Sequence, residues 1–284
     1  MIGMQLRSAV ARGTRLIVVD PRDIGLSKTS DLHIKLKPGT NVAFANGIVR
    51  QLIHDDLIDH AFIECRTEGF ADLKAMVEAY TPERVAQICA IDPRDLIAAA
   101  RLYGRADRAA IVYCLGVTEH SSGTEGVMSL SNIAMVTGKY GRPGCGINPL
   151  RGQNNVQGAC DMGASPGQFP GYQNLSAPGV LEKFEKAWGT HLPRFKGLYA
   201  TDCFPKMIEG EVKGLFIFGE DPVRTDPDTH HVIKALKNLE FLVVDELFLT
   251  ETAKYADVVL PGRSYAEKEG TFSNTERRVQ RIRK

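Results

Sequence analysis

The sequence predicts an α/β protein built from two units, and three observations carry this prediction. Short apolar runs such as Leu16–Val19 end in acidic residues, which is typical of buried parallel strands with a polar carboxyl end. Segments with helical spacing of apolar residues separate these runs. The alternation stops in a loop-rich stretch at residues 164–178 and begins again at Leu215, which divides the elements into two groups.

Composition narrows the class of protein. The chain has 284 residues, of which 43% are hydrophobic, enough for one large core or two moderate ones. A formal net charge of +1 gives no electrostatic reason to expect nucleic acid or a membrane surface as partner. No apolar run is long enough to span a membrane, and no signal pattern opens the sequence. The six cysteines are scattered without CxxC spacing, so we expect reduced thiols in a cytoplasmic protein and no zinc or iron–sulfur site formed by this chain alone.

The first unit should begin with a short helix over residues 1–12, followed by the strand Leu16–Val19. Asp20 and Arg22 follow that strand directly. Ligands of open α/β sheets bind beyond the carboxyl ends of the strands, where an acidic residue can accept the hydroxyls of a ribose. Asp20 can also be only a turn residue before proline, and the local sequence does not separate these two interpretations.

A second short strand is predicted at Leu32–Leu36, and a helix follows it, capped by Thr40 or Asn41. The amides of its first turn would suit the polar edge of a nucleotide. Two later helices should each begin with a capping residue before proline, at Thr81 and Asp92. The inward face of the helix after Asn41 should comprise Val42, Ala45, Val49, Leu52 and Ile53.

A further buried strand is predicted at Ala109–Tyr113, and the polar loop Cys114–His120 follows it. This order of strand, polar loop and helix again places candidate ligand contacts at the carboxyl edge of a sheet. His120 can be a proton shuttle, but a histidine in such a loop is more often a hydrogen-bonded structural residue. Both interpretations of His120 stay open.

The segment Asn148–Gly163 has no apolar period, so it predicts neither an amphipathic helix nor a half-buried strand. It is rich in amides around Arg151. If it were buried, its polar groups would need a polar ligand, and the planar guanidinium of Arg151 would suit a carboxylate or a phosphate. A solvated loop of the same composition is the alternative.

The second unit should contain a short amphipathic helix at residues 181–188, a helix at about 228–237 and three strands. Acidic residues close the first two of these strands, which suggests a second nucleotide-sized crevice, although such residues also begin ordinary helices. Neither a GxGxxG nor a Walker motif is present, which argues against an ordinary NAD-binding domain. The predicted strands are Leu215–Phe218, Phe241–Val244 and Ala256–Leu260.

Several motifs follow one another along nearly the whole chain. They are VVDPR at 18–22, KPGTN at 37–41, LGVTEH at 115–120, RGQNNVQGACDMG at 151–163, PGYQ at 170–173, GEDP at 219–222 and EKEGTFSNTERRVQ at 267–280. With these motifs the chain resembles the central part of the catalytic (alpha) subunit of formate dehydrogenases, in the molybdopterin oxidoreductase family. The resemblance implies two Rossmann-like, three-layer α/β units of the type found in dimethyl sulfoxide reductase. It implies residues 1–150 as the first unit, 151–262 as the second, and 263–284 as a segment that returns to the first.

The resemblance also implies a bis-molybdopterin guanine dinucleotide with Mo or W. One guanosine end would be held by Asp20, Arg22, Gly39, Thr40 and Asn41, and Leu115 and Glu119 would line the path to its pterin. The second dinucleotide would be held by Gly219, Glu220, Asp221, Thr225, Asp245 and Glu246, while Lys268 would reach a phosphate or pterin oxygen. Family members often carry aspartate where this chain has Asn41, which can still bond guanine without charge. Arg151 would clamp the carboxylate of formate, with Gln153 as a further hydrogen-bond partner.

The departures from the family pattern imply a fragment. A [4Fe–4S] module and the cysteine or selenocysteine that ligates the metal would precede residue 1, and a barrel domain would follow residue 284. Such a fragment should not oxidise formate alone and would depend on these domains and on electron-transfer subunits. The alternatives are a relative with another substrate and a module that only binds a guanine dinucleotide.

Overall fold

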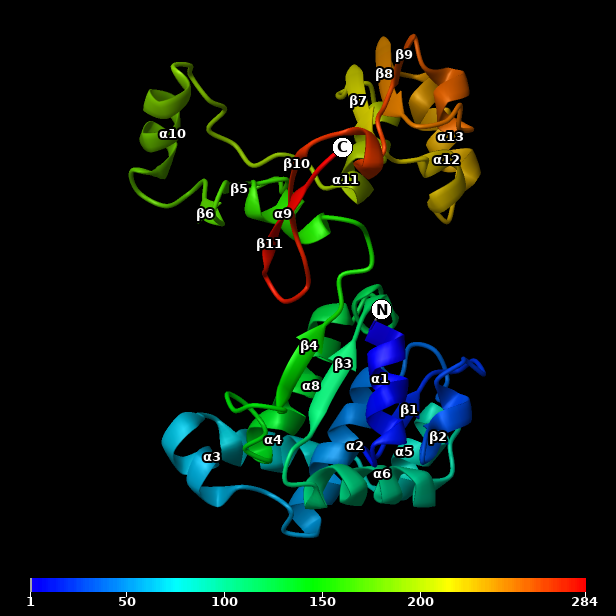
Figure 1. Cartoon of the computed structure of the whole chain (residues 1–284), viewed down its shortest axis with the longest axis vertical. Helices are drawn as coiled ribbons and strands as arrows, with labels where there is room; N and C mark the ends of the chain where they lie inside the picture. Colours follow the sequence, from blue (N-terminus) through cyan, green and yellow to red (C-terminus); the bar gives the residue numbers. More distant parts are fainter. Residues whose placement is uncertain (1) are drawn as a thin grey trace. The chain divides into compact units, whose positions relative to one another are not determined.

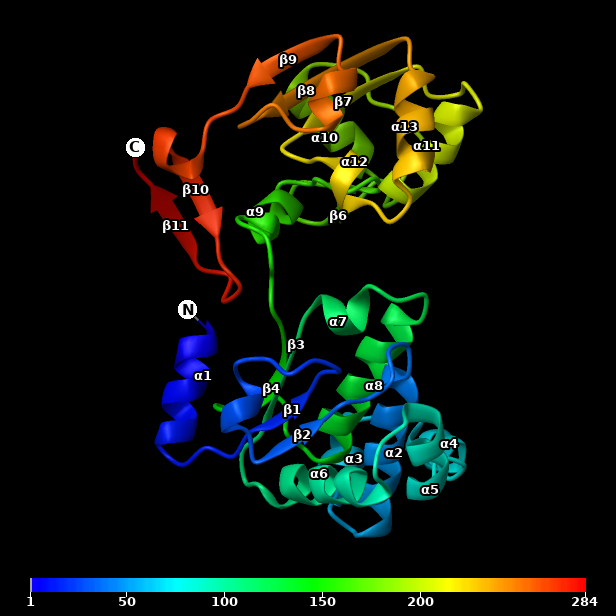
Figure 2. The same cartoon turned by 90° about the vertical axis from the view of Figure 1, so that its right-hand side faces the viewer.

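The computed structural model describes residues 2–284, and the chain divides into two compact units, Met1–Gly152 and Gln153–Lys284. Each unit has a hydrophobic core of its own. Parallel strands joined by helices occur in both units, so the predicted α/β fold is confirmed. Figures 1 and 2 show the course of the chain through the helices and strands of each unit.

Within residues 2–152, the first unit contains two pairs of parallel strands and eight α-helices. β1 pairs with β2, and β3 pairs with β4. Figure 2 shows these strands between α1 on one side and α2 and α8 on the other. The elements are α1 (Ile2–Ala11), β1 (Ile17–Val19), β2 (Leu32–Ile34), α2 (Asn41–His54), α3 (His60–Arg66), α4 (Phe70–Val77), α5 (Pro82–Cys89), α6 (Pro93–Arg105), β3 (Ala110–Tyr113), α7 (Leu115–Thr118), α8 (Gly123–Val136) and β4 (Gly146–Pro149).

Helix α2 is the centre of this core and contacts α4, α5, α6 and α8. Its close packing depends on Gly47, where a Cβ atom would lie 2.8 Å from Cγ2 of Val85. Ala45, Val49 and Leu52 are buried as predicted, whereas Val42 and Ile53 are only half-buried. The buried face instead includes Phe44 and Ile48, because α2 is surrounded by helices and not packed on one side only.

The prediction of fully buried strands is wrong for the first unit. In β1 only Val18 is buried, and β3 alternates between exposed and half-buried residues. These are two-stranded sheets: Ile17, Leu32 and Ile111 pack against the helical core and are only partly buried, whereas Val19 and Val112 are exposed.

The second unit is organised around the parallel sheet β7–β8–β9. Helices α11 and α13 lie on one side of this sheet (Figures 1 and 2), and Val232, Leu236 and Met207 from these helices share its core. On β7, Phe216 and Phe218 remain exposed. The elements are α9 (Val156–Asp161), β5 (Gln168–Phe169), β6 (Gln173–Asn174), α10 (Val180–Trp188), α11 (Ala200–Ile208), β7 (Gly214–Phe218), α12 (Pro222–Thr225), α13 (Thr229–Lys237), β8 (Phe241–Glu246), β9 (Val258–Pro261), β10 (Gly270–Ser273) and β11 (Val279–Ile282).

Two features of the second unit bear on the sequence predictions. The segment Asn148–Gly163, for which the sequence predicts neither an amphipathic helix nor a half-buried strand, contains the end of β4 and the short helix α9. The apolar pattern of the sequence could not indicate α9, because this helix is held by hydrogen bonds more than by an apolar face. The segment 263–284 forms the antiparallel hairpin β10–β11, which contacts α9, and its predicted return to the first unit stays a prediction.

Candidate functional site

At the carboxyl end of β1, Asp20 is fixed by four contacts. Its amide donates to the carbonyl of Ile34, and its own carbonyl lies 3.0 Å from Nε2 of His33. Its Oδ1 accepts a hydrogen bond from the amide of Arg22 at 2.8 Å and a weaker one from the Arg22 Nε. Oδ2 of Asp20 accepts no hydrogen bond from the residues that the structure describes. The carboxylate is therefore held in place with one oxygen available to a ligand.

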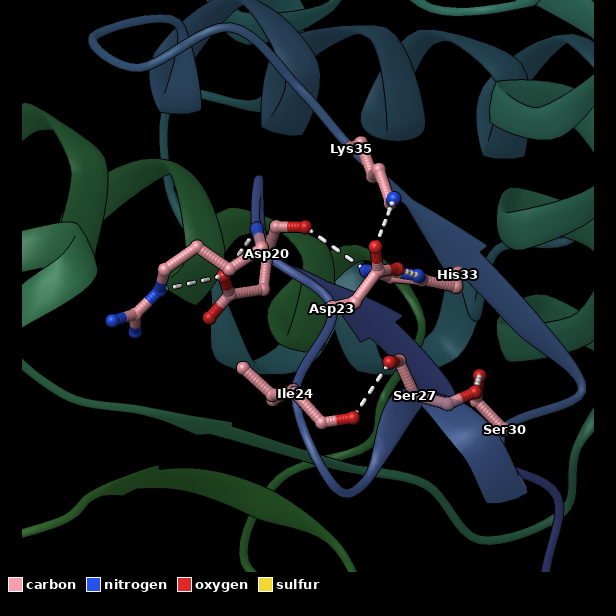
Figure 3. A network of polar contacts seen from close by, with 8 residues as sticks. Asp20, Asp23, Ile24, Ser27, Ser30, His33 and Lys35 are labelled. Atoms are coloured by element: carbon pink, nitrogen blue, oxygen red, sulfur yellow. Dashed lines mark hydrogen bonds and ion pairs between the residues drawn. The ribbon is translucent and has the colours of Figure 1, made fainter.

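His33 and Asp23 lie beside Asp20 in this turn (Figure 3). The Nδ1 atom of His33 lies 3.7 Å from Oδ1 of Asp23, and Lys35 donates to the other oxygen of Asp23 at 2.7 Å. That hydrogen bond from the Lys35 ammonium lowers the pKa of Asp23. Sequence reasoning missed His33, and the only available signal was its position in the strand that pairs with β1.

The amino end of α2 lies at the same edge as the loop after β3. Nδ2 of Asn41 donates to the carbonyl of Gly116 at 3.0 Å, across 75 residues of sequence. The hydroxyl of Thr40 donates to the carbonyl of Lys37, so the predicted capping of α2 by this side chain is wrong. Without a side-chain cap, the first amides of α2 remain available as donors.

The loop after β3 carries Leu115 and Glu119, and both side chains are exposed. The ring of His120 lies 3.1 Å from the carbonyl of Gly116, which supports the structural interpretation of this histidine. Leu115, Glu119 and Asn41 thus gather around one short helix, α7, at the carboxyl end of β3.

Arg151 follows β4, which runs parallel to β3. The amide of Leu150 donates to the carbonyl of Tyr113, and Sγ of Cys114 donates to the carbonyl of Leu150. These bonds continue the pairing of the two strands to the residue before Arg151. Arg151 is exposed. Because β3 and β4 are parallel, it follows β4 at the same sheet edge as the Cys114–Glu119 loop after β3.

In the second unit, the loop after β7 begins with Gly219, whose φ of +65° favours glycine and beside which a Cβ would meet nothing within 4 Å. Thr225 donates to Oε1 of Glu220 at 2.9 Å, and both side chains are exposed. The carboxylate of Asp221 has another role: its Oδ1 accepts from the hydroxyl of Thr252 at 2.6 Å and from the Thr252 amide at 3.0 Å. Thr252, which the sequence did not point to, therefore fixes this loop.

Asp245 and Glu246 end β8 beside that loop. The carbonyl of Asp245 accepts from the amide of Gly219, and Oε1 of Glu246 accepts from the amide of Leu247. A Cβ at Gly262 would lie 2.7 Å from Oδ1 of Asp245, so this glycine leaves space for the carboxylate. Burial and the charge of Glu220 raise the pKa of the neighbouring Asp226.

Three of the motifs meet around α9. Asn155 and Asp161 come from the long amide-rich motif, Tyr172 from PGYQ, and Ser273 from the last motif. The amide of Ser273 donates to Oδ1 of Asn155 at 3.0 Å, and the hydroxyl of Tyr172 donates to Oδ1 of Asp161 at 2.9 Å. Hydrogen bonds from Gln157 and Tyr172 lower the pKa of Asp161. The hydrogen bond to Asp161 in turn raises the pKa of Tyr172.

The candidate residues are divided between the two units. Asp20, Arg22, Gly39, Thr40, Asn41, Leu115, Glu119 and Arg151 belong to the first unit; Gly219, Glu220, Asp221, Thr225, Asp245 and Glu246 share one edge of the second-unit sheet; Gln153 precedes α9. Gln153 and Lys268 are exposed, and Lys268 lies on the segment that leads into β10.

The comparison with known families decides the class of this chain. The sequence profile described as molybdopterin oxidoreductase matches residues 1–284. The chain belongs to the molybdopterin oxidoreductase family. The resemblance found in the sequence is thereby confirmed, and with it a molybdopterin as the cofactor of the family.

Two relatives within the family are similar over almost the whole chain. The alpha subunit of an F420-dependent formate dehydrogenase from Methanocaldococcus jannaschii is 50% identical over 287 residues, covering 100% of this chain and 42% of the relative. Formate dehydrogenase H of Escherichia coli is 45% identical over 276 residues, covering 97% of this chain and 39% of the relative. The chain thus spans about two fifths of the length of the curated relatives it matches.

A solved structure gives the same architecture. Acetylene hydratase from Pelobacter acetylenicus superposes with a TM-score of 0.75 at 22% sequence identity, covering 98% of this chain and 41% of that one. At this identity the likeness establishes the fold alone. Among residues 2–284, we find no helix long and apolar enough to cross a membrane.

Proposed function

We propose that this chain forms the central part of the catalytic subunit of a formate dehydrogenase, which oxidises formate to CO2. There it would help to hold a bis-molybdopterin guanine dinucleotide with Mo or W and would bind formate. The observation that carries the proposal is the amide-rich segment around Arg151, which is exposed where β4 ends. The chain that carries it is 50% identical to a formate dehydrogenase alpha subunit. Arg151 and Gln153 are the residues that we assign to the substrate.

The first unit has donors and acceptors that fit one guanosine. The open oxygen of Asp20 can accept from hydroxyl or amino groups, and the uncapped amides of α2 can bond an anionic or carbonyl oxygen. Arg22 is 80% exposed and close to Asp20, so its guanidinium is accessible to a phosphate. A Cβ at Gly39 would meet nothing within 4 Å, which leaves room for a ligand. Leu115 and Glu119 would then line the approach from guanosine to pterin.

The second unit fits a second guanosine in a different way. Because the Asp221 carboxylate accepts a hydrogen bond from Thr252, we assign Asp221 to holding the loop. Gly219, Glu220 and Thr225 would contact the ligand. Asp245 and Glu246 would accept hydrogen bonds from its polar groups. Lys268 would contribute a cation toward a phosphate or pterin oxygen.

When bound, the metal and its pterins would supply the redox chemistry by accepting the two electrons of the formate C–H bond, whose hydrogen leaves as a proton. Arg151 would bind the formate carboxylate through two parallel hydrogen bonds, and this planar grip would aim the C–H bond. The amide of Gln153 would add a hydrogen bond to the same small acid. Removing one donor of this kind commonly costs about 10²–10³ in rate.

We also propose that these 284 residues do not oxidise formate alone. Within the part of the chain that the structure describes, no group of three or more His, Cys, Asp or Glu residues could hold a metal. The metal-ligating residue and a [4Fe–4S] cluster would come from other parts of a complete subunit. Electron-transfer subunits would then take up the electrons.

The test is the substitution Arg151→Lys in the complete catalytic subunit. Lysine keeps the charge but loses the planar fork, so we expect kcat/KM for formate to fall by about 10²-fold or more while metal and pterin contents stay unchanged. Arg142→Lys is the matched control, because Arg142 is also an exposed arginine of the first unit, paired with Asp107. An unchanged kcat/KM for formate in Arg151→Lys would remove Arg151 from the mechanism.

A second candidate is a module that binds guanine dinucleotide without redox chemistry. It is favoured by the polar groups at the carboxyl ends of the strands in both units, among them Asp20, Glu220 and Thr225. Saturable binding of GDP or GMP to the chain, combined with no formate oxidation by the complete and fully loaded subunit, would support this candidate. A relative with another substrate would instead turn over a different small acid, oxyanion or aldehyde in a substrate panel.

A further inference from the structure

The short helix α9 is held at its amino end by Asn155. This residue has a left-handed backbone with φ of +57°, a conformation that asparagine tolerates better than most other side chains. Its Oδ1 accepts the amide of Ser273, 118 residues later, at 3.0 Å. One side chain thus ties the start of α9 to the hairpin β10–β11.

Gly158 shows how closely the Asn155 side chain lies against the helix. A Cβ at Gly158 would come 2.1 Å from Oδ1 and 2.9 Å from Cγ of Asn155. No real side chain can occupy that position while Asn155 stays where it is. The position of the Asn155 side chain therefore requires glycine at residue 158.

The carboxyl end of α9 is held by further hydrogen bonds around Asp161. Nε2 of Gln157 donates to Oδ1 of Asp161 and to the hydroxyl of Tyr172, each at 2.8 Å. The amide of Gly171 donates to the carbonyl of Asp161 at 2.8 Å. Tyr172 itself has a φ of +59°, so a second strained residue lies in this cluster.

A helix of six residues is too short to be stable by itself, so these contacts fix its place. Gln153 lies three residues before Val156, the first residue of α9, and its carbonyl accepts from the amide of Val156 at 3.5 Å. The loop that carries Gln153 therefore leads into a helix whose two ends are both held by hydrogen bonds.

We propose that Asn155 is a positioning residue for Gln153. Through the Ser273–Asn155 hydrogen bond, the hairpin β10–β11 fixes where the amide of Gln153 can reach. This inference rests on the proposed role of Gln153 toward formate. It adds that the hairpin, far away in sequence, takes part in binding the substrate.

The kinetic test compares two substitutions of Asn155 in the complete catalytic subunit. Asn155→Gly keeps the left-handed backbone but loses the acceptor, whereas Asn155→Asp keeps the acceptor. We expect kcat/KM for formate to fall about tenfold in the glycine variant, because misplacement of a substrate-binding group is costly, and to recover in the aspartate variant. Asp56→Gly is the matched control, since Asp56 is another left-handed residue, with φ of 52°, and lies in the first unit.

A double-mutant cycle with Gln153→Ala separates this inference from the proposed function. If Gln153→Ala leaves kcat/KM unchanged, the assignment of Gln153 to the substrate fails. If Gln153→Ala lowers kcat/KM and Asn155→Gly does not, or if the two losses multiply independently, the positioning role fails. Non-additive losses, in which Asn155→Gly costs nothing further once Gln153 is alanine, support it.

Hydrogen exchange of the 284-residue chain gives a readout that needs neither cofactor nor activity. We expect the amide of Ser273 to be protected in the unmodified chain and in Asn155→Asp, and to exchange faster in Asn155→Gly. Val156 should lose protection together with Ser273. Equal exchange at Ser273 in all three proteins would overturn the inference, whatever the kinetics show.

Discussion

At the scale of single residues, Asp20 and Asp221 show why two acidic residues after similar strands differ. Each ends a predicted strand-and-turn motif, and local sequence gives them the same role. Asp20 uses Oδ1 to hold its own turn and leaves Oδ2 without a hydrogen bond from the described residues, whereas Asp221 accepts from Thr252, 31 residues further along the chain. Spacing could predict that an acidic residue stands at the sheet edge, but not that a distant hydroxyl would engage it.

Asp20→Asn tests the ligand role at the first edge. The amide keeps an acceptor for the Arg22 amide but loses the charge and one acceptor, so the affinity of the chain for GDP should fall about tenfold. Isothermal titration with GDP measures this. Asp107→Asn, an exposed acid between α6 and β3, should bind GDP like the unmodified chain. Equal affinity of all three proteins would contradict the role of Asp20.

Thr252→Val tests the structural role of the Asp221 contact. Thr252 is fully buried, and its hydroxyl both donates to Asp221 and accepts from the amide of Val223 at 3.1 Å. Valine has nearly the same shape, but it removes the hydrogen bond to Asp221 and the acceptor for the Val223 amide, so the free energy of unfolding should fall by about 1–3 kcal/mol. Urea unfolding measures the loss, and the exposed Thr190→Val should change little. Unchanged stability of Thr252→Val would contradict this role.

At the scale of elements, helix starts were predictable where proline and a capping residue occur together. Thr81 accepts from the amide of Arg84, and Asp92 accepts from the amide of Arg94, as the sequence indicated. Thr40 has no proline beside it, and its hydroxyl turns back to the carbonyl of Lys37. Alternative backbone partners within the preceding loop explain why the capping prediction failed there.

These caps predict a difference in stability between two similar substitutions. Thr81→Ala removes a bond to a helix amide and should lower the free energy of unfolding by about 1 kcal/mol. Thr40→Ala removes a hydroxyl that caps no helix amide, so its effect should be smaller. Chemical denaturation of both variants measures the difference. A larger loss for Thr40→Ala would show that the assignment of the caps is wrong.

The link between α2 and α6 should depend on pH. Arg101 of α6 donates to Oδ2 of Asp55 at 2.6 Å, and this hydrogen bond holds the pKa of Asp55 well below its usual range. Because the folded-state pKa is depressed, the contribution is complete above the unfolded pKa of about 3.9 and is lost as the pH falls toward the folded value. Asp55→Asn should therefore destabilise the protein at pH 7, and the difference should narrow below about pH 4. A difference that stays constant with pH would contradict the link.

At the scale of the whole molecule, the sequence predicted an α/β protein because the strand and helix patterns are local. It could not predict that α9, the Tyr172 turn and the hairpin β10–β11 would meet, since the contact between Asn155 and Ser273 spans 118 residues. The sequence drew attention to Arg151 within its amide-rich segment but left open whether that segment is buried or solvated, and the structure shows Arg151 exposed. Its place at the end of β4 follows from the pairing of β4 with β3, which the sequence did not reveal.

The most direct test of the account is formate oxidation by the complete catalytic subunit, purified with its cofactor and assayed with an artificial electron acceptor. We predict formate-dependent reduction of the acceptor, together with Mo or W and a pterin that carries guanine nucleotide in the purified protein. A subunit that holds this cofactor in full, yet oxidises no formate and turns over a different substrate, would contradict the central claim.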